Sequence, residues 1–361
     1  SNKIAKYDNG AWVLCDAGAL VTGTYQDLIA DPWNYSRYFV LSTTGLWKCD
    51  DLWNTPNAWT QVATESTITG TVGVTPTQIK MSINRRGYIV VHFGASSVAY
   101  TFNYGSSWAR VNMFGGGVDT TNDAATNGFT RGPAISQWNN PGASNQGWLY
   151  GLANGSPGTL YRSKDWGVTW SSLLSIASFS DDGRGYIHIP YYRADGTPNK
   201  NDANQEILIY TAGQLRRVTP AGASTSLNVG NGFRRGNSTS WNDGRYMLTS
   251  FTFSGAQLAS VSDGAGATPA APIWQTTEDG ASSWTNRGAY SAQTNNQVVG
   301  INGWPDTPND LIAWGKGAIV VSFDRGATYT DIGTPLLSLI TNPYLPTVVL
   351  WDLSLQIPPA S

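Results

Sequence analysis

The stretch LYRSKDWGVTW, residues 160–170, places a hydroxyl, a carboxylate and an indole in one short turn. Asp165 lies two residues after Ser163 and five before Trp170, and an apolar, strand-like segment leads into the turn. Gly167, two residues after the acid, permits the positive φ that tight turns need. The turn is therefore either a reactive site or the structural end of a β-hairpin, and the rest of the sequence decides between these two interpretations.

The same pattern recurs as YTFNYGSSW (100–108), TTEDGASSW (276–284) and VSFDRGATY (321–329). We call it the box turn: a hydroxyl residue, an Asp or Asn two residues later, and an aromatic residue five residues after that. Recurrence along the chain is typical of a repeat protein rather than of a single active site. The acid or amide positions are Asn103, Asp165, Asp279 and Asp324, and the aromatic positions are Trp108, Trp170, Trp284 and Tyr329.

Two degenerate copies complete a set of six units. Residues 45–62 have a lengthened turn, and residues 207–227 keep the flanking strands but lose the acid. In every unit two further strand candidates precede the pair around the turn, so each unit supplies four strands, as a propeller blade does. The second strands are expected at 38–42, 88–94, 148–155, 206–213, 246–251 and 310–317.

A seventh blade is expected from the two ends of the chain. Residues 336–355 supply its first two strands and residues 10–23 its last two, with Trp12 to Asp16 paired between residues 347–353 and 19–23. Sharing a blade in this way closes the ring and removes exposed sheet edges. The prediction is an all-β fold, a single seven-bladed β-propeller domain over residues 1–361, with four-stranded antiparallel blades at about 24–62, 75–112, 131–175, 185–228, 236–287 and 296–332 and a closing blade shared by the termini.

The composition agrees with such a fold and excludes several functions. Forty glycines, 18 prolines, 12% aromatic and 13% charged residues describe a chain rich in turns and poor in helix formers. Lys and Arg number 22 against 24 Asp and Glu, and the net charge of −2 gives no electrostatic basis for binding nucleic acid or an anionic membrane. No continuous apolar run is long enough to cross a bilayer. We expect no nucleic-acid partner and no membrane insertion.

With these repeats the chain resembles the Asp-box, or BNR-repeat, β-propellers, which include sialidases, xyloglucan-degrading hydrolases, sortilin-type receptors and photosystem-assembly factors. LYRSKDWGVTW is similar to the family's Ser-x-Asp-x-Gly-x-x-Trp box. ADPWN (30–34) and NGWPDTPNDLIAWGKG (302–317) are similar to the turn before the second strand in its hydrolase and receptor branches. The resemblance implies the fold, with each box between the third and fourth strands on the face away from the usual ligand site, and it implies no particular activity.

The box residues and the few Cys and His residues all receive a structural interpretation. A box carboxylate can accept hydrogen bonds from the N–H groups of its own turn, and the aromatic ring covers the hairpin. Cys15 and Cys49 stand where the box hydroxyl is expected, and we expect two buried free thiols. His92 and His188 lie in strand patterns and are interpreted as core histidines. The sequence therefore predicts no metal site and no cofactor.

The catalytic patterns of two enzyme branches are missing. The chain has no Arg-Ile-Pro motif near its start, unlike sialidases, and has Thr43 and Thr44 where xyloglucan hydrolases carry an Asp before the Gly of their first blade. Three long loops are expected at 112–133, 172–185 and 251–272. Asp123 and Asp182, on the first two loops, are the candidate carboxylates for a glycosidase pair.

A candidate binding site comes from Arg-Gly pairs that precede the innermost strand of three consecutive blades. Three guanidiniums at the channel mouth would suit a carboxylate or sulfate, and aromatic side chains beside them could stack on sugar rings. The alternative is that each Arg caps carbonyls or pairs with nearby acids such as Asp181. The residues are Arg131, Arg184 and Arg235, with Phe129, Phe233 and Tyr290 beside them.

These observations predict a non-catalytic recognition module, with a glycan or a surface protein as its ligand. A chain rich in Ser, Thr, Asn and Gly suits an extracellular, cell-surface or virion protein, attached to a larger assembly. The first alternative is a glycoside hydrolase or lyase that acts at the channel mouth. The second is a scaffold for protein assembly.

Overall fold

The computed structural model describes residues 4–8, 10–15, 21–94, 97–113, 131–135, 147–153, 158–176, 186–190, 193, 195, 197, 199, 202–211, 214–227, 247–250, 258–262, 273–277, 285–289, 298–304, 307–315 and 318–333. These residues are mostly β-structure, with one short helix, α1 (Glu65–Thr69), which begins where the Thr64 hydroxyl accepts a hydrogen bond from the N–H of Thr67. Within this described part, no helix has the length and apolar character of a membrane span.

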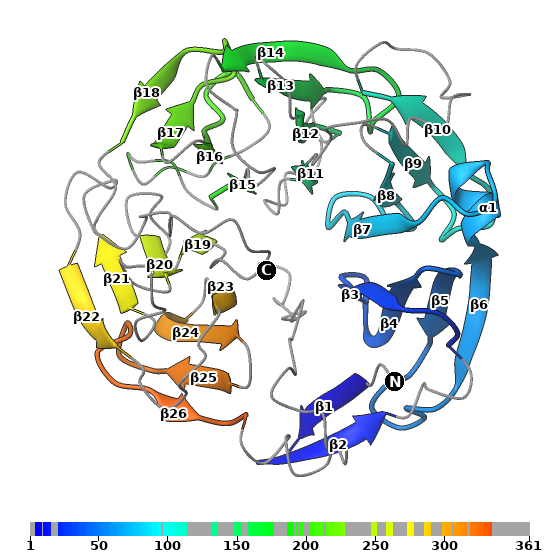
Figure 1. Ribbon diagram of the computed structural model, residues 1–361, viewed down its shortest axis with the longest axis horizontal. Helices are drawn as coiled ribbons and strands as arrows, with labels where there is room; N and C mark the ends of the chain where they lie inside the picture. Colours follow the sequence, from blue (N-terminus) through cyan, green and yellow to red (C-terminus); the bar gives the residue numbers. More distant parts are fainter. Residues whose placement is uncertain are drawn as a thin grey trace.

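Within the described residues, the strands form six four-stranded antiparallel sheets and one two-stranded sheet, arranged as a ring (Figure 1). In each four-stranded sheet, which we call a blade, the strands follow one another in chain order, and the first strand lies nearest the centre of the ring (Figure 1). Antiparallel blades of this kind were the core of the sequence prediction, and that part of it is confirmed.

The blades are numbered along the chain. Blade 1 has β3 (Tyr25–Asp31), β4 (Asn34–Ser42), β5 (Gly45–Cys49) and β6 (Trp59–Thr64), and blade 2 has β7 (Pro76–Met81), β8 (Ile89–Phe93), β9 (Ser97–Thr101) and β10 (Ala109–Asn112). Blade 3 has β11 (Arg131–Ile135), β12 (Leu149–Ala153), β13 (Gly158–Ser163) and β14 (Ser171–Ile176), and blade 4 has β15 (Tyr186–His188), β16 (Ile207–Thr211), β17 (Gln214–Val218) and β18 (Ser224–Ser226). Blade 5 has β19 (Met247–Ser250), β20 (Leu258–Ser262), β21 (Ile273–Thr277) and β22 (Thr285–Ala289), and blade 6 has β23 (Val298–Trp304), β24 (Thr307–Gly315), β25 (Ala318–Ser322) and β26 (Thr330–Asp331).

The two-stranded sheet corrects the predicted pairing at the N-terminus. β2 (Ala11–Cys15) pairs with β1 (Ile4–Asp8), so the predicted pairing of residues 12–16 with residues 19–23 is wrong. The reason is the turn at Gly10, whose φ of 80° lets the chain reverse directly after β1. The other predicted partners, in residues 336–355, lie outside the described residues. The described chain therefore has fewer four-stranded blades than the seven predicted.

Trp12 joins the N-terminal hairpin to the last described blade. Its indole Nε1 donates a hydrogen bond to the backbone oxygen of Ile332 at 2.6 Å, across almost the whole length of the chain. β2 and β26 accordingly lie next to each other in the ring (Figure 1). This contact brings the beginning of the sequence against blade 6.

Blade 5 is shifted by one strand from its predicted assignment. The segment predicted as its second strand, 246–251, contains β19, which is the first strand and pairs with β20, Leu248 opposite Ser260. β20 itself lies in the segment predicted as a long loop. Small and polar residues dominate its surroundings, GAQLASVSDGAG (255–266), so the sequence shows little of the alternation that marks a strand.

The described core lies between neighbouring blades, and both faces of blades 1, 2 and 3 are covered. All of β8 is buried, and its successive residues face opposite sides, as in any strand. Ile89 and Val91 pack against Phe39 and Leu41 of blade 1, whereas Val90 packs in the cluster shared with blade 3. A strand with two buried faces reads as a continuous apolar run, which explains why β8 was recognisable in the sequence.

Polar contacts add to this packing between blades. The buried Asp27 carboxylate on β3 accepts a hydrogen bond from the N–H of Ile79 on β7 at 2.8 Å. Arg162 of blade 3 donates to the backbone oxygen of Pro220 of blade 4 at 2.7 Å. Each bond uses a backbone group that the strand pairing of its own blade leaves open, so adjacent blades are held in a fixed relation.

Candidate functional site

The box turn at 163–170 is closed by its own side chains. The Asp165 carboxylate accepts hydrogen bonds from the N–H and the hydroxyl of Thr169, at 2.8 and 2.6 Å, and from the Ser163 hydroxyl at 2.8 Å. The buried Ser163 oxygen in turn accepts from the N–H of Gly167 at 2.8 Å. Trp170 donates its indole N–H to the oxygen of Gly167 at 3.0 Å. Every named residue of the pattern thus has a structural partner inside the turn.

Two further copies repeat this geometry closely. Asp324 accepts from the N–H and the hydroxyl of Thr328, at 2.7 and 2.5 Å, and from the Ser322 hydroxyl at 2.8 Å. In blade 2 the amide oxygen of Asn103 accepts from the Thr101 hydroxyl at 2.7 Å and from the N–H of Ser107 at 3.0 Å. All three turns join the third and fourth strands of their blades. The copy with Asp279 and Trp284 lies outside the described residues.

The electrostatics of the turns match this structural use. Burial opposes the ionised form of Asp165, but the hydrogen bonds from Thr169 and Ser163 outweigh it and lower the pKa of the carboxyl. Hydrogen bonds from Thr328 likewise lower the pKa of Asp324. A carboxyl that donates a proton in catalysis needs a raised pKa, so these two groups are poorly suited to act as general acids.

The residue after the acid has left-handed backbone geometry in all three turns. Tyr104, Trp166 and Arg325 have φ values of 56°, 64° and 60°. Their N–H groups donate to the backbone oxygens of Gly87, Gly147 and Asn309, which stand before or at the start of the second strand. This conformation is uncommon for residues other than glycine. The hydrogen bonds within the box turn and those from these N–H groups to the second strand maintain it.

Because of that conformation, an aromatic side chain reaches back over the preceding blade. The Trp166 ring lies edge-on to the buried Tyr88 ring of blade 2, with centroids 4.9 Å apart, and its backbone oxygen accepts the Tyr88 hydroxyl at 2.7 Å. The Tyr104 ring stacks on Phe39 of blade 1 at 6.2 Å. The sequence did not predict this role, although the aromatic character of positions 104 and 166 was visible in it.

Arg85 also contacts blades 2 and 3 where their turns are exposed to solvent. Its guanidinium carbon lies 3.8 Å from the centroid of the Phe102 ring and 5.3 Å from that of the Trp166 ring. Arg85 and Arg86 are exposed, and Phe102 keeps 38% of its surface accessible. Trp33 is 44% exposed and lies beside the turn that carries Arg85, because its indole N–H donates to the oxygen of Ser82 at 2.9 Å.

We call Trp33, Arg85, Arg86, Phe102 and Trp166 the arginine–aromatic surface. Trp33 belongs to the turn between the first two strands of blade 1, and the arginines to the corresponding turn of blade 2. In an antiparallel sheet these turns lie at the same end as the turn between strands three and four. The surface therefore lies on the face of the ring that carries the box turns, which we call the box face. No sequence motif singled it out as a surface, because its members come from four separate turns.

The acids near this surface already have partners. Asp31, which is fully buried, forms an ion pair with Arg37 at 3.1 Å and accepts from the N–H of Trp33 at 2.9 Å. Asp165 is held within its own turn, as described above. Among the residues that the structure describes, neither Arg85 nor Arg86 forms an ion pair with a carboxylate. The two guanidiniums therefore carry positive charge that no ion pair among the described residues neutralises.

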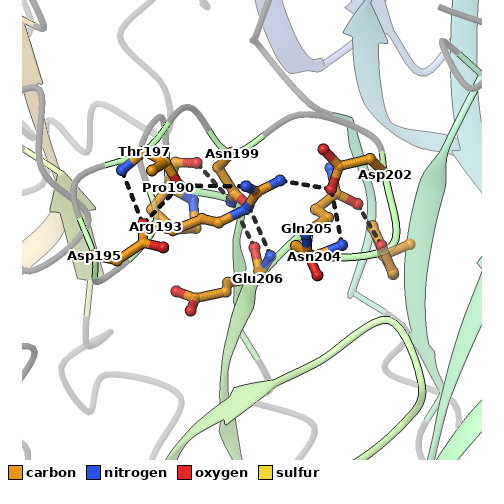
Figure 2. Close-up of polar contacts among 10 residues, drawn as sticks. Pro190, Arg193, Asp195, Thr197, Asn199, Asp202, Asn204, Gln205 and Glu206 are labelled. Atoms are coloured by element: carbon orange, nitrogen blue, oxygen red, sulfur yellow. Dashed lines mark hydrogen bonds and ion pairs between the residues drawn. The ribbon is translucent and has the colours of Figure 1, made fainter.

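A second polar cluster lies in the connection between β15 and β16, shown in Figure 2. The buried Asn199 side chain donates to the oxygens of Pro190 and Glu206, at 2.8 and 2.7 Å, and accepts from the N–H of Glu206 at 2.7 Å. Arg193 donates to Asp202 at 2.5 Å and to the Thr197 hydroxyl at 3.2 Å. The polar groups of the cluster mainly bind one another, so the cluster stabilises the connection between β15 and β16.

Of the predicted arginine site, only Arg131 lies within the described residues. Arg131 is the first residue of β11, the strand of blade 3 nearest the centre of the ring. Arg184 and Arg235 lie outside the described residues, and β19, the first described strand of blade 5, begins at Met247. The remaining predicted residues, Phe129, Phe233, Tyr290, Asp123 and Asp182, also lie outside the described residues.

The two cysteines and His92 occupy the interior, whereas His188 is partly buried. Cys15 and Cys49 are buried and free. Cys49 ends β5 at the position of a box hydroxyl, as predicted. Cys15 ends β2, the outer strand of its hairpin, and so does not stand at the position of a box hydroxyl. His92 is buried on β8, and burial lowers the pKa of His188 on β15 to about 4. Within the described part of the chain, no group of three or more Cys, His, Asp or Glu residues could hold a metal ion.

Comparison with known proteins adds to the evidence for the fold. No protein-family model and no curated protein matches the sequence. Among solved structures, YCF48 from Cyanidioschyzon merolae is 12% identical over 88% of this chain and 87% of its own, with a TM-score of 0.51. YCF48 bound to D1 peptide is 14% identical over 92% of this chain and 84% of its own, with a TM-score of 0.50. The chain is a β-propeller.

An enzyme and a repeat protein of another kind are also among the matches. The GH74 xyloglucanase from Xanthomonas campestris is 13% identical over 86% of this chain but only 45% of its own, with a TM-score of 0.55. The WD40 repeats of RRP9 are 8% identical over 86% of this chain and 80% of their own, with a TM-score of 0.54. At these identities the similarity shows the fold and leaves the function open.

Proposed function

We propose that this propeller is a non-catalytic recognition module that binds a glycan or a surface protein outside the cytoplasm, on a cell surface or a virion. The observation that carries the proposal is the arginine–aromatic surface. There the exposed Arg85 guanidinium lies 3.8 Å from the centroid of the Phe102 ring and 5.3 Å from that of the Trp166 ring, and it forms no ion pair with a carboxylate among the described residues. Exposed Trp and Arg side chains of this kind are the residues that dominate binding energies at interfaces.

The box carboxylates support a non-catalytic function. A retaining or inverting glycosidase needs two carboxyls across the scissile bond, one of them with a raised pKa. Asp165 and Asp324 instead have lowered pKa values, and each is bound within its own turn. The glycoside hydrolase alternative therefore depends on Asp123 and Asp182, for which the described residues supply no geometry.

The comparisons support a recognition function by example. One YCF48 structure of similar fold carries a bound D1 peptide, so a propeller of this general type can bind a peptide. The xyloglucanases are enzymes on a similar propeller, but this chain corresponds to less than half of their length. The second alternative is a scaffold for protein assembly. Such a scaffold binds its partners through the same kind of surface as a recognition module does.

The experiment combines a binding screen with a turnover assay. The full chain is screened on a glycan array and against a library of short random peptides, and it is incubated with sialosides, xyloglucan and other β-glucans. We expect ligands in at least one screen and no product release. Product release that Asp123→Asn or Asp182→Asn abolishes would place the chain among the glycoside hydrolases, and the absence of any ligand in both screens would refute recognition.

A further inference from the structure

We infer that the arginine–aromatic surface binds an acidic segment of a protein partner. This inference rests on the proposed recognition function and names its surface and its ligand class. The surface spans the first three blades on the box face.

Charge is the first step. The whole chain has a net charge of −2, so the molecule as a whole does not attract polyanions. Locally, Arg85 and Arg86 are adjacent and exposed. The nearby Asp31 is neutralised by Arg37, and Asp165 is held by hydrogen bonds within its own turn. A short acidic segment can meet this local charge without the extended positive surface that a nucleic acid requires.

The second step is what the surface offers to a ligand. The Arg85 guanidinium lies over Phe102 and Trp166, so it occupies space above the rings that a sugar would otherwise use for stacking. A guanidinium that lies over an aromatic ring keeps N–H donors that can bind a carboxylate in a forked pair. The arrangement thus favours recognition of a carboxylate by Arg85 over stacking of a neutral sugar.

The third step is breadth and composition. The surface extends from Trp33 in blade 1 to Trp166 in blade 3 and combines Trp, Phe and Arg, the types enriched at protein interfaces. The partly exposed Phe102 ring supplies apolar area beside the charge. A peptide with carboxylates next to apolar side chains can use both features together.

Blade 6 supplies matched controls. Phe323 stands between Ser322 and Asp324 as Phe102 stands between Thr101 and Asn103, and it is 66% exposed. Arg325 follows the acid of the same turn, and its Nε donates to Asn309 at 2.8 Å. Phe323→Ser and Arg325→Gln therefore remove an aromatic ring and a positive charge from the same face, away from the proposed surface.

The test selects short random peptides on the immobilised full chain and measures the affinity of each enriched peptide by fluorescence anisotropy at low and physiological ionic strength. We expect peptides enriched in Asp and Glu, which bind more weakly at higher salt. Arg85→Gln and Phe102→Ser should each weaken binding by about tenfold or more, because a lost charge-assisted contact or interface anchor commonly has that effect. Phe323→Ser and Arg325→Gln should change it by less than about twofold.

Folding is checked separately, since Arg85 also contacts two rings. Circular dichroism and thermal melting of each variant establish that it is folded, and Arg85→Lys provides a second variant that keeps the charge but loses the planar donor pair. We expect Arg85→Lys to weaken binding, though less than Arg85→Gln does.

Three results would overturn the inference. They are a lack of acidic enrichment, equal binding by wild type and Arg85→Gln, and glycan hits that Arg85→Gln abolishes while no peptide is selected. The last result would assign the surface to an acidic glycan. Ligands that bind the wild type and every variant equally would leave the recognition function standing and refute only this surface.

Discussion

Replacing Asp165 with Ala removes the acceptor that closes the box turn of blade 3. Three hydrogen bonds are lost, two from Thr169 and one from Ser163. Thr169 is exposed, so water replaces its lost acceptor at little cost, whereas Ser163 is buried and its hydroxyl loses its acceptor. An unsatisfied buried donor costs about 1–3 kcal/mol, and we expect a loss of about 2 kcal/mol in the free energy of unfolding. For a chain of 361 residues, the expected fall in Tm is about 3 °C.

Asp165→Asn supplies the internal control, because blade 2 already uses an amide at this position. The Asn103 oxygen accepts from Thr101 and Ser107, and its nitrogen donates to the Ser107 hydroxyl at 3.0 Å. An Asn at position 165 can make the corresponding bonds, so this variant should lose less than about 1 kcal/mol. Urea denaturation at pH 7, with equal m-values for the three proteins, measures both differences.

The pH dependence follows from the lowered pKa of Asp165. The stabilisation from the carboxylate is fully present above the ordinary aspartate value of about 3.9 and is lost as the pH falls through the lower folded-state value. Wild type and Asp165→Ala should therefore converge in stability at strongly acid pH. The reasoning is refuted if Asp165→Ala melts like the wild type at pH 7, or if Asp165→Asn is as unstable as Asp165→Ala.

Three further changes test the contacts between segments. Tyr88→Phe removes the buried bond to the oxygen of Trp166 and should lower the stability by about 1–2 kcal/mol in urea denaturation. Trp12→Phe removes the bond to Ile332 between the N-terminal hairpin and blade 6, and should lower the Tm measurably while leaving the far-ultraviolet circular dichroism unchanged. Burial lowers the pKa of His188 to about 4, so stability should fall between pH 6.5 and 4, and His188→Gln should flatten that slope in a pH series of melts.

The fold was predictable where local chemistry fixes it. A box turn needs a hydroxyl, an acceptor and a glycine at fixed spacing, because all its bonds form within a few residues. Ser163 and Asp165 therefore predict the hairpin of blade 3 from the sequence alone. Ser322 and Asp324 predict the hairpin of blade 6 in the same way. The apolar run of β8 is equally informative, because burial on both faces leaves no place for polar residues.

The prediction failed where pairing is decided by distant segments. β2 was assigned the wrong partner, since nothing local shows that residues 4–8 form a strand beside it. β20 was missed because small residues such as Ala259 and Ser260 suit a strand or a loop equally well until neighbouring strands enclose them. The arginine–aromatic surface was missed for the same reason: Arg85 meets Trp166 only after two blades have packed together.

The box turn explains how one face of the ring can be both a scaffold and a recognition surface. Its acid, its two hydroxyl residues and its glycine are committed to bonds within the turn, so they cannot change without loss of stability. The position between the hydroxyl and the acid carries no such duty, and it holds Phe102, Lys164 and Phe323 in the three turns. Side chains there and in the neighbouring turns can vary between blades while the blades stay in register. A face built in this way keeps its geometry and leaves its surface chemistry free to suit a partner.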